Sequence, residues 1–101
     1  MIVLTTLGAD ADASAFARTL IKEKLAACVS TLPPMTSVYR WKGSIEEARE
    51  QQVVIKTTAA HVDALQARFR TLHPYEVPEF LIVRPEDAST LYAEWVRESV
   101  G

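Results

Sequence analysis

SVYRWKGSIEEAREQQVVIKTT, residues 37–58, decides the fold, because its middle part is compatible with two different structures. Residues 44–51 contain good helix formers, and Ser44 followed by Glu47 matches the capping box that begins many helices. Residues 53–58 are rich in β-branched side chains, which is typical of a strand. Local propensity therefore favours a helix over residues 44–51, whereas a hairpin requires a strand there.

The part of the chain before this stretch predicts a strand, a helix and an extended segment. Residues 1–7 are apolar and partly β-branched, which indicates a strand. The next apolar residues fall on one helical face, in a helix expected to end near Ala26; they are Ala13, Phe16, Ala17, Leu20 and Ile21. Residues 28–41 look extended, but Pro33 and Pro34 cannot donate ladder hydrogen bonds and therefore predict a bulge or an edge.

The part after it predicts two more helices with a strand between them. The second helix carries apolar residues at helical spacing, namely Val62, Leu65, Phe69 and Leu72. It must end at Pro74, because a proline disfavours the helical conformation of the preceding residue. A strand is expected over Glu79–Val83. The third helix has a predicted core face made of Ala88, Leu91, Tyr92, Trp95 and Val96.

Taken as strand, helix, strand, strand, helix, strand and extra helix, the order is that of an α+β, ferredoxin-like split βαβ sandwich. We expect one domain over residues 1–101. Two helices then cover one face of a four-stranded antiparallel sheet. The other face needs a cover.

Composition excludes several classes of partner. The formal net charge is -2, and the 11 Lys and Arg residues are scattered rather than gathered into a basic stripe, so we expect no nucleic acid. No apolar run approaches the roughly 20 residues of a membrane span, and the N-terminus lacks the pattern of a secretory signal. With a single cysteine, Cys28, these features predict a soluble cytoplasmic protein.

Several collinear blocks resemble the CutA divalent-cation tolerance family over nearly the whole chain. They are EKLAACVS, SVYRWKGSIEE, VVIKTT, HPYEVPE and YAEWVRESV. The resemblance implies a ferredoxin-like fold similar to that of PII signalling proteins, a tight homotrimer and a role in tolerance to copper and other divalent metals. No established reaction comes with it.

The resemblance also implies that residues 44–58 are the second arm of a long hairpin, with a turn at Lys42 and Gly43. An arm of about 14 residues spans nearly 46 Å, against a radius of gyration of about 13 Å for a domain of this size. The hairpin must therefore project, and its apolar residues need burial in neighbouring subunits; they include Val38, Trp41 and Ile45.

His73 is the predicted metal ligand. The resemblance aligns a copper-binding cysteine and two histidines of some bacterial relatives with Thr5, Leu72 and His73, so only His73 remains a metal-binding residue type. A site made of the His73 imidazole and the carboxylates of Glu76 and Glu79 favours copper(II) or zinc over copper(I). We expect no metal ion to be obligatory for the protein. A histidine held at a helix end by hydrogen bonds fits the same position.

A ligand cleft between subunits is predicted from the same resemblance. It would contain Tyr39, Trp41, Lys56, Glu76 and Glu79. We expect Glu76 to neutralise Lys56, because an unpaired buried lysine is costly. Cys28 is better explained as a small buried side chain than as a ligand. The segment VRPEDAS, residues 83–89, departs from the family's pattern, so we expect this loop to differ in shape from that of the relatives. We assign no function to the difference.

Three functions remain compatible with these residues. The first is a non-enzymatic homotrimer that binds divalent metal or a small ligand in the clefts between subunits. The second is a PII-like signalling or scaffold trimer. The third is an enzyme that uses Lys56, His73 and Glu76 as acid, base and electrostatic groups.

Overall fold

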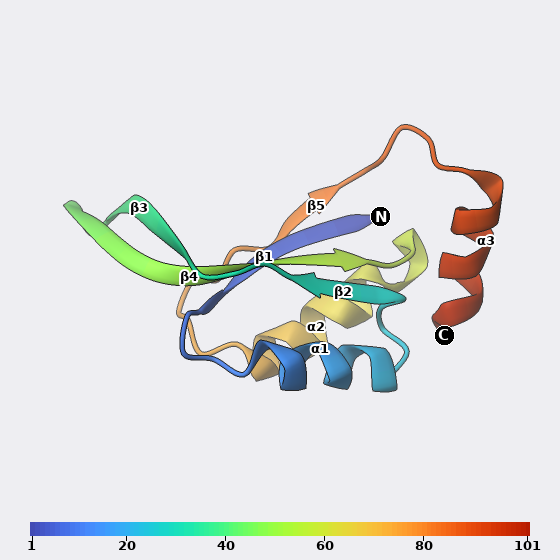
Figure 1. Cartoon of the computed structure of the whole chain (residues 1–101), viewed down its shortest axis with the longest axis horizontal. Coiled ribbons are helices and arrows are strands. Elements are labelled where there is room, and N and C mark those ends of the chain that lie inside the picture. Colours follow the sequence, from blue (N-terminus) through green and yellow to red (C-terminus); the bar gives the residue numbers. More distant parts are fainter.

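A computed structural model describes residues 1–101, and its fold is α+β with one antiparallel sheet, as predicted (Figure 1). The strands are β1 (Ile2–Gly8), β2 (Cys28–Thr31), β3 (Met35–Trp41), β4 (Ser44–Lys56) and β5 (Leu81–Val83). The helices are α1 (Ala13–Lys22), a short 3-10 turn (Ala59–His61), α2 (Val62–Leu72) and α3 (Thr90–Ser99). The sheet order is β2-β4-β1-β5, with β3 paired to the outer part of β4.

Residues 44–56 form a single strand, so the helix favoured by local propensity is wrong and the hairpin is confirmed. The outer half of β4 pairs with β3, from Trp41 opposite Ser44 to Met35 opposite Glu50. The inner half pairs with β1 and β2. These ladders outweigh the helix propensities of residues 44–51, which differ from those of other residues by only roughly a few tenths of a kcal/mol each. At about 3.3 Å per residue β4 is roughly 43 Å long, close to the 45 Å length of the molecule.

The tip of the hairpin is a two-residue turn at Lys42 and Gly43. Their φ angles are 48° and 83°, both in the left-handed region, which is the geometry of a type I′ turn. The twist of that turn matches the twist of the flanking strands, so the hairpin continues without splaying.

Between β2 and β3 the chain makes the predicted break at Pro33 and Pro34. The Leu32 amide still donates to the Gln52 carbonyl, at 2.9 Å. Beyond the break, the guanidinium of Arg49 donates to the Thr36 hydroxyl and the Pro34 carbonyl, at 3.2 and 3.5 Å. One long strand therefore serves two shorter ones along the same edge.

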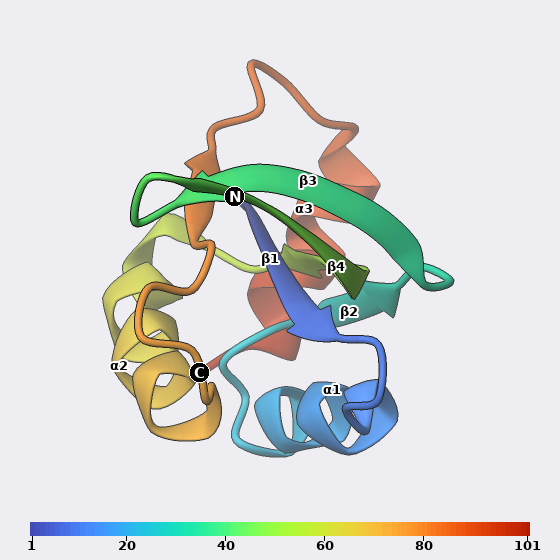
Figure 2. The same ribbon diagram turned by 90° about the vertical axis from the view of Figure 1, so that its left-hand side faces the viewer.

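Helices α1 and α2 cover one face of the sheet (Figures 1 and 2). Their apolar sides meet the alternate residues of β1 and β4 in a core that includes Val3, Leu7, Phe16, Leu20, Val53, Ile55, Leu65 and Phe69. Phe16 of α1 and Phe69 of α2 pack edge to face, with ring centroids 6.2 Å apart. The core thus holds the two helices together as well as against the sheet.

The first helix ends at Lys22, four residues before the predicted end near Ala26. Lys24 has a φ of 58°, and its amide donates to the Ile21 carbonyl while the Leu25 amide donates to the Leu20 carbonyl. This pair of bonds is a Schellman ending. It usually selects glycine, and the lysine in that place hid the helix end from the sequence pattern.

The third helix departs most from expectation. Its predicted core face is largely exposed: Leu91 is 81% exposed, Tyr92 and Trp95 are over two-fifths exposed, and only Val96 is buried. The helix stands beyond the end of the sheet, next to the C-terminus (Figure 1). The strand predicted over residues 79–83 is also shorter, since β5 begins at Leu81. Both regions leave apolar side chains without a cover within one chain.

No helix in the structure has the length and apolar character needed to cross a membrane.

The left-handed turn gives a testable prediction about stability. Replacing Gly43 by Val is expected to destabilise the fold by about 1–2 kcal/mol, because a β-branched residue resists positive φ. Lys42→Asn is the matched control, since asparagine tolerates this conformation and should be neutral or stabilising. Thermal midpoints at one protein concentration compare the two variants. Equal losses in both would show that the turn does not set the hairpin.

Candidate functional site

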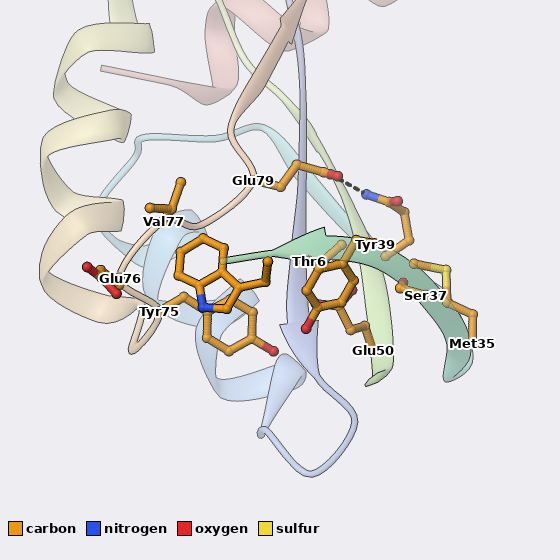
Figure 3. A pocket seen from close by; sticks show the side chains of 11 residues that line it. Thr6, Met35, Ser37, Tyr39, Glu50, Tyr75, Glu76, Val77 and Glu79 are labelled. Atoms are coloured by element: carbon orange, nitrogen blue, oxygen red, sulfur yellow. Dashed lines mark hydrogen bonds between the residues drawn. The ribbon is translucent and has the colours of Figure 1, made fainter. Parts of the chain in front are cut away.

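A concave region lies between the hairpin and the segment 75–79, and we call it the hairpin cleft. Its volume is about 720 Å³, within the usual range of small-molecule pockets. The residues that line it are Thr6, Met35, Ser37, Tyr39, Trp41, Glu50, Gln52, Tyr75, Glu76, Val77 and Glu79 (Figure 3). They come from β1, β3, β4 and the connection between α2 and β5.

Four of the predicted site residues meet in this cleft. Tyr39 and Trp41 come from β3, and Glu76 and Glu79 come from the proline-bounded connection. The two groups lie about 40 residues apart in sequence. They meet because β3 extends the sheet past the end of β1, where the connection after α2 returns.

Lys56 lies elsewhere, so it does not pair with Glu76 within one chain, and the pairing expected in a cleft between subunits stays a prediction. Lys56 ends β4, where it pairs with Ile2 and Cys28, and it lines a second cavity of about 640 Å³ beneath α3. Glu76 instead faces Lys42 at the hairpin tip, with Nζ 3.8 Å from Oε2. Both side chains are largely exposed, so this ion pair contributes little to stability.

His73 is buried, with 8% of its surface exposed, and it contacts Thr6 and Tyr75, two residues that line the hairpin cleft. Its Nε2 lies 2.6 Å from the Thr6 carbonyl oxygen, which can only accept, so Nε2 carries the proton. The Tyr75 amide donates to Nδ1 at 3.2 Å. Both nitrogens are therefore engaged, and the ring packs between Phe69 and Tyr75 at centroid distances of 5.0 and 4.6 Å.

This arrangement corresponds to the structural alternative for His73 rather than to a free metal ligand. Pro74 ends α2 as predicted, with His73 extended at φ −94° and ψ 132°. No three His, Cys, Asp or Glu side chains are grouped so that they could hold a metal ion. His61 bonds to Thr58, with Nδ1 2.6 Å from the hydroxyl, and Cys28 has its Sγ 3.7 Å from the Ser30 hydroxyl.

Glu79 is held in place by the strand beside it. The Thr5 hydroxyl donates to the Glu79 carbonyl at 2.6 Å, and the Gln52 amide donates to a Glu79 carboxylate oxygen at 3.0 Å. The same Gln52 nitrogen donates to the Thr5 carbonyl at 2.7 Å. The carboxylate is therefore oriented into the hairpin cleft by two strands of the sheet (Figure 3).

Glu50 and Tyr75 are the residues that sequence reasoning missed. Glu50 sits where three strands meet, opposite Gly8 on one side and Met35 on the other, and it is only 9% exposed. The signal was available: once residues 44–56 are a strand, Glu50 and Gln52 point to the same face as Thr6. The helical interpretation of residues 44–51 concealed it.

The pKa of the Tyr75 hydroxyl is raised above its ordinary value of 10.0. Burial contributes most, followed by the charge of Glu50, a hydrogen bond to Glu50 and the nearby Tyr39. Each of these disfavours a second negative charge at this place. The deep end of the cleft therefore holds a carboxylate next to a phenol that stays neutral.

Comparison with known proteins then identifies the family. The model of the CutA1 divalent ion tolerance protein family matches residues 1–99. This chain belongs to that family. The Thermus thermophilus divalent-cation tolerance protein CutA is 38% identical over 100 residues, covering 99% of this chain and 97% of the relative. The protein of that name from Escherichia coli (strain K12 / DH10B) is 37% identical, covering 99% and 89%.

Solved structures of CutA proteins share the fold. The Thermus thermophilus Cut A1 structure gives a TM-score of 0.93 at 38% identity, covering 99% of this chain and 97% of that one. The PII-like protein CutA from Nostoc sp. PCC 7120, in apo form, gives 0.92 at 30% identity, covering 99% and 96%. Both the CutA resemblance and the PII-like fold predicted from the sequence are confirmed.

The Tyr75 environment gives a second testable prediction. Glu50→Gln removes a charge that opposes the phenolate, so the pKa of Tyr75 should fall toward 10.0 while burial keeps it above that value. NMR titration of the tyrosine ring signals measures the change, with Glu86→Gln in an exposed loop as the control. Because the folded pKa is raised, stability from the neutral phenol is present below pH 10.0 and lost as pH rises through the folded value. A Tyr75 titration unmoved by Glu50→Gln would contradict this account.

Proposed function

We propose that this chain is a non-catalytic, homotrimeric divalent-cation tolerance protein whose hairpin cleft holds a ligand. The observation that carries the proposal is the hairpin cleft itself. It gathers three carboxylates and three aromatic rings from three strands and a connecting segment, beside a projecting hairpin. Nothing in it resembles a nucleophile with its base, and the family is named for tolerance rather than for a reaction.

Assembly is supported by the apolar surface that one chain leaves uncovered. Ile45 on the hairpin is 73% exposed, and the three residues of β5 are also exposed. Together with the exposed side of α3 they leave several large apolar side chains uncovered, which is typical of a surface that meets another protein chain. Closed symmetric assembly covers such surfaces without creating open-ended fibres. The number three is what the CutA resemblance implies.

Metal binding has a specific chemical form in this proposal. His73 does not fit as a ligand in this arrangement, because the Thr6 carbonyl and the Tyr75 amide occupy both ring nitrogens. The oxygens of Glu50, Glu76 and Glu79 remain as donors, and they are spread over the cleft rather than grouped around one point. Zinc or copper(II) held there would be weakly bound and exchangeable.

The enzyme alternative has less support within one chain. Its acid, base and electrostatic groups were Lys56, His73 and Glu76. Lys56 lies beneath α3, and Glu76 is exposed near the hairpin tip. The ring of His73 is hydrogen-bonded to the backbone carbonyl of Thr6. The PII-like scaffold alternative keeps the shared fold in its favour. Thermal-shift screening separates it from ligand binding, because a ligand that binds the folded state raises the melting temperature.

The third prediction concerns assembly. Light scattering at micromolar concentration should give a mass near three times the chain mass of 11.2 kDa. Ile45→Asp should shift the population toward smaller species, because it places a charge on the exposed apolar arm. Lys22→Asp on the outer side of α1 is the control and should leave the mass unchanged. A folded wild-type monomer would exclude the assembly proposal.

The fourth prediction concerns metal. Calorimetric titration with zinc or copper(II) at neutral pH should show weak binding that Glu79→Gln reduces severalfold, since it removes a charged oxygen donor. His73→Gln should have little effect on the affinity. If His73 were the ligand instead, His73→Gln would abolish the binding. Metal affinity unchanged in both variants, with the assembly intact, would remove the metal site from the proposal.

A further inference from the structure

The hairpin cleft has an unusual charge balance. Three of its residues are glutamates, and no lysine, arginine or histidine lines it. Its other prominent side chains are the rings of Tyr39, Trp41 and Tyr75. Aromatic faces carry negative electrostatic potential, so rings and carboxylates together favour one kind of guest, a positive charge.

Glu50 is a carboxylate at the bottom of the cleft, so the preference for a positively charged guest extends to that end. It is 9% exposed, and neither of the two ion pairs in the chain involves it. Its neighbour is the neutral Tyr75 hydroxyl, whose pKa is raised first by burial and then by the Glu50 charge. A positively charged guest beside Glu50 would give this carboxylate the cationic partner that no lysine or arginine of the chain supplies.

The chain itself supplies an example of the expected contact. The Lys42 ammonium lies 5.5 Å from the centroid of the Trp41 ring and 3.8 Å from a Glu76 carboxylate oxygen. A primary ammonium thus already rests on one ring and one carboxylate at the rim of the cleft. Deeper in the cleft, the rings of Tyr39 and Tyr75 lie close to Glu50 with no such cation among the lining residues (Figure 3).

The geometry distinguishes an organic cation from a metal ion. A metal needs several donor atoms around one point, and no three suitable side chains are grouped in this way. An alkylammonium ion needs apolar and aromatic walls around a delocalised charge, with a carboxylate within reach. Met35 and Val77 add apolar wall to the three rings, and about 720 Å³ is ample for such a molecule.

We propose that the hairpin cleft binds a small organic cation, an alkylammonium of the choline type. Its charged head lies against the rings of Tyr39 and Tyr75 and faces Glu50, and its methyl or methylene groups contact Met35 and Val77. The inference rests on the proposed function in one respect, that this cleft is the ligand site. It assigns the chemical class of ligand, which the metal proposal does not.

The test uses choline chloride and its uncharged carbon isostere, 3,3-dimethylbutan-1-ol. The two have nearly the same shape and differ in charge, so a preference for choline measures cation recognition directly. The chain has two tryptophans, Trp41 and Trp95. In a Trp95→Phe background the fluorescence reports Trp41 alone, and calorimetry on the unmodified chain gives the same comparison without any substitution.

We expect saturable binding of choline and none of the isostere over the same concentration range. Glu50→Gln and Tyr39→Leu should each weaken choline binding about tenfold, as expected for one charge contact or one cation–π contact. Glu86→Gln removes an equal charge outside the cleft and should change nothing. The assembly mass of each variant is measured alongside, so that a loss of binding is not a loss of structure.

Other outcomes overturn the inference in distinguishable ways. Equal binding of choline and its isostere would show an apolar site without cation recognition. Zinc binding that depends on Glu79, with no choline binding, would leave the proposed function standing and reject this ligand class. A third outcome is that neither choline nor zinc binds, in an intact assembly whose neighbouring chain occupies the cleft. This result would reject both the ligand class and the cleft as a ligand site.

Discussion

The pairing of β4 with three other strands is the constraint on which the rest of the structure depends. Its inner residues pair with β1 on one side and β2 on the other, and its outer residues pair with β3. A slip of one residue would turn every side chain of β4 to the opposite face, exposing Val53 and Ile55 and burying Gln52 in the core. One register therefore fixes the core, the projection of the hairpin and the position of Glu50.

The sequence predicted those features that local chemistry determines. Pro74 ends α2, Pro33 and Pro34 interrupt the extended segment, and Lys42 with Gly43 turns the hairpin, because each is a backbone restriction that tertiary contacts do not override. The strand at residues 44–51 required the family resemblance. Its pairing partners on β1, Leu7 and Gly8, lie more than 40 residues away, and propensity contains no information on them.

The candidate site was predictable only in part, for a related reason. Tyr39, Trp41, Glu76 and Glu79 were expected near one another and are. Lys56 was expected with them in a cleft between subunits. Within one chain it is the last residue of the 13-residue strand β4, and it lines a different cavity. The apolar side of α3 was assigned to the core on periodicity alone. Periodicity shows which side of a helix is apolar, and it does not show whether the same chain covers that side.

The break at Pro33 and Pro34 separates two parts of the sheet that share β4. Residues 35–41 form ladder pairs only with residues 44–50, so the hairpin arms can gain or lose paired residues without disturbing β2, β1 or the helices. Such changes are acceptable in steps of two per arm, because each step preserves the alternation of faces. The length of the hairpin can thus change while the residues of the core stay as they are. The reach of the molecule and the depth of its cleft can evolve separately from its folding.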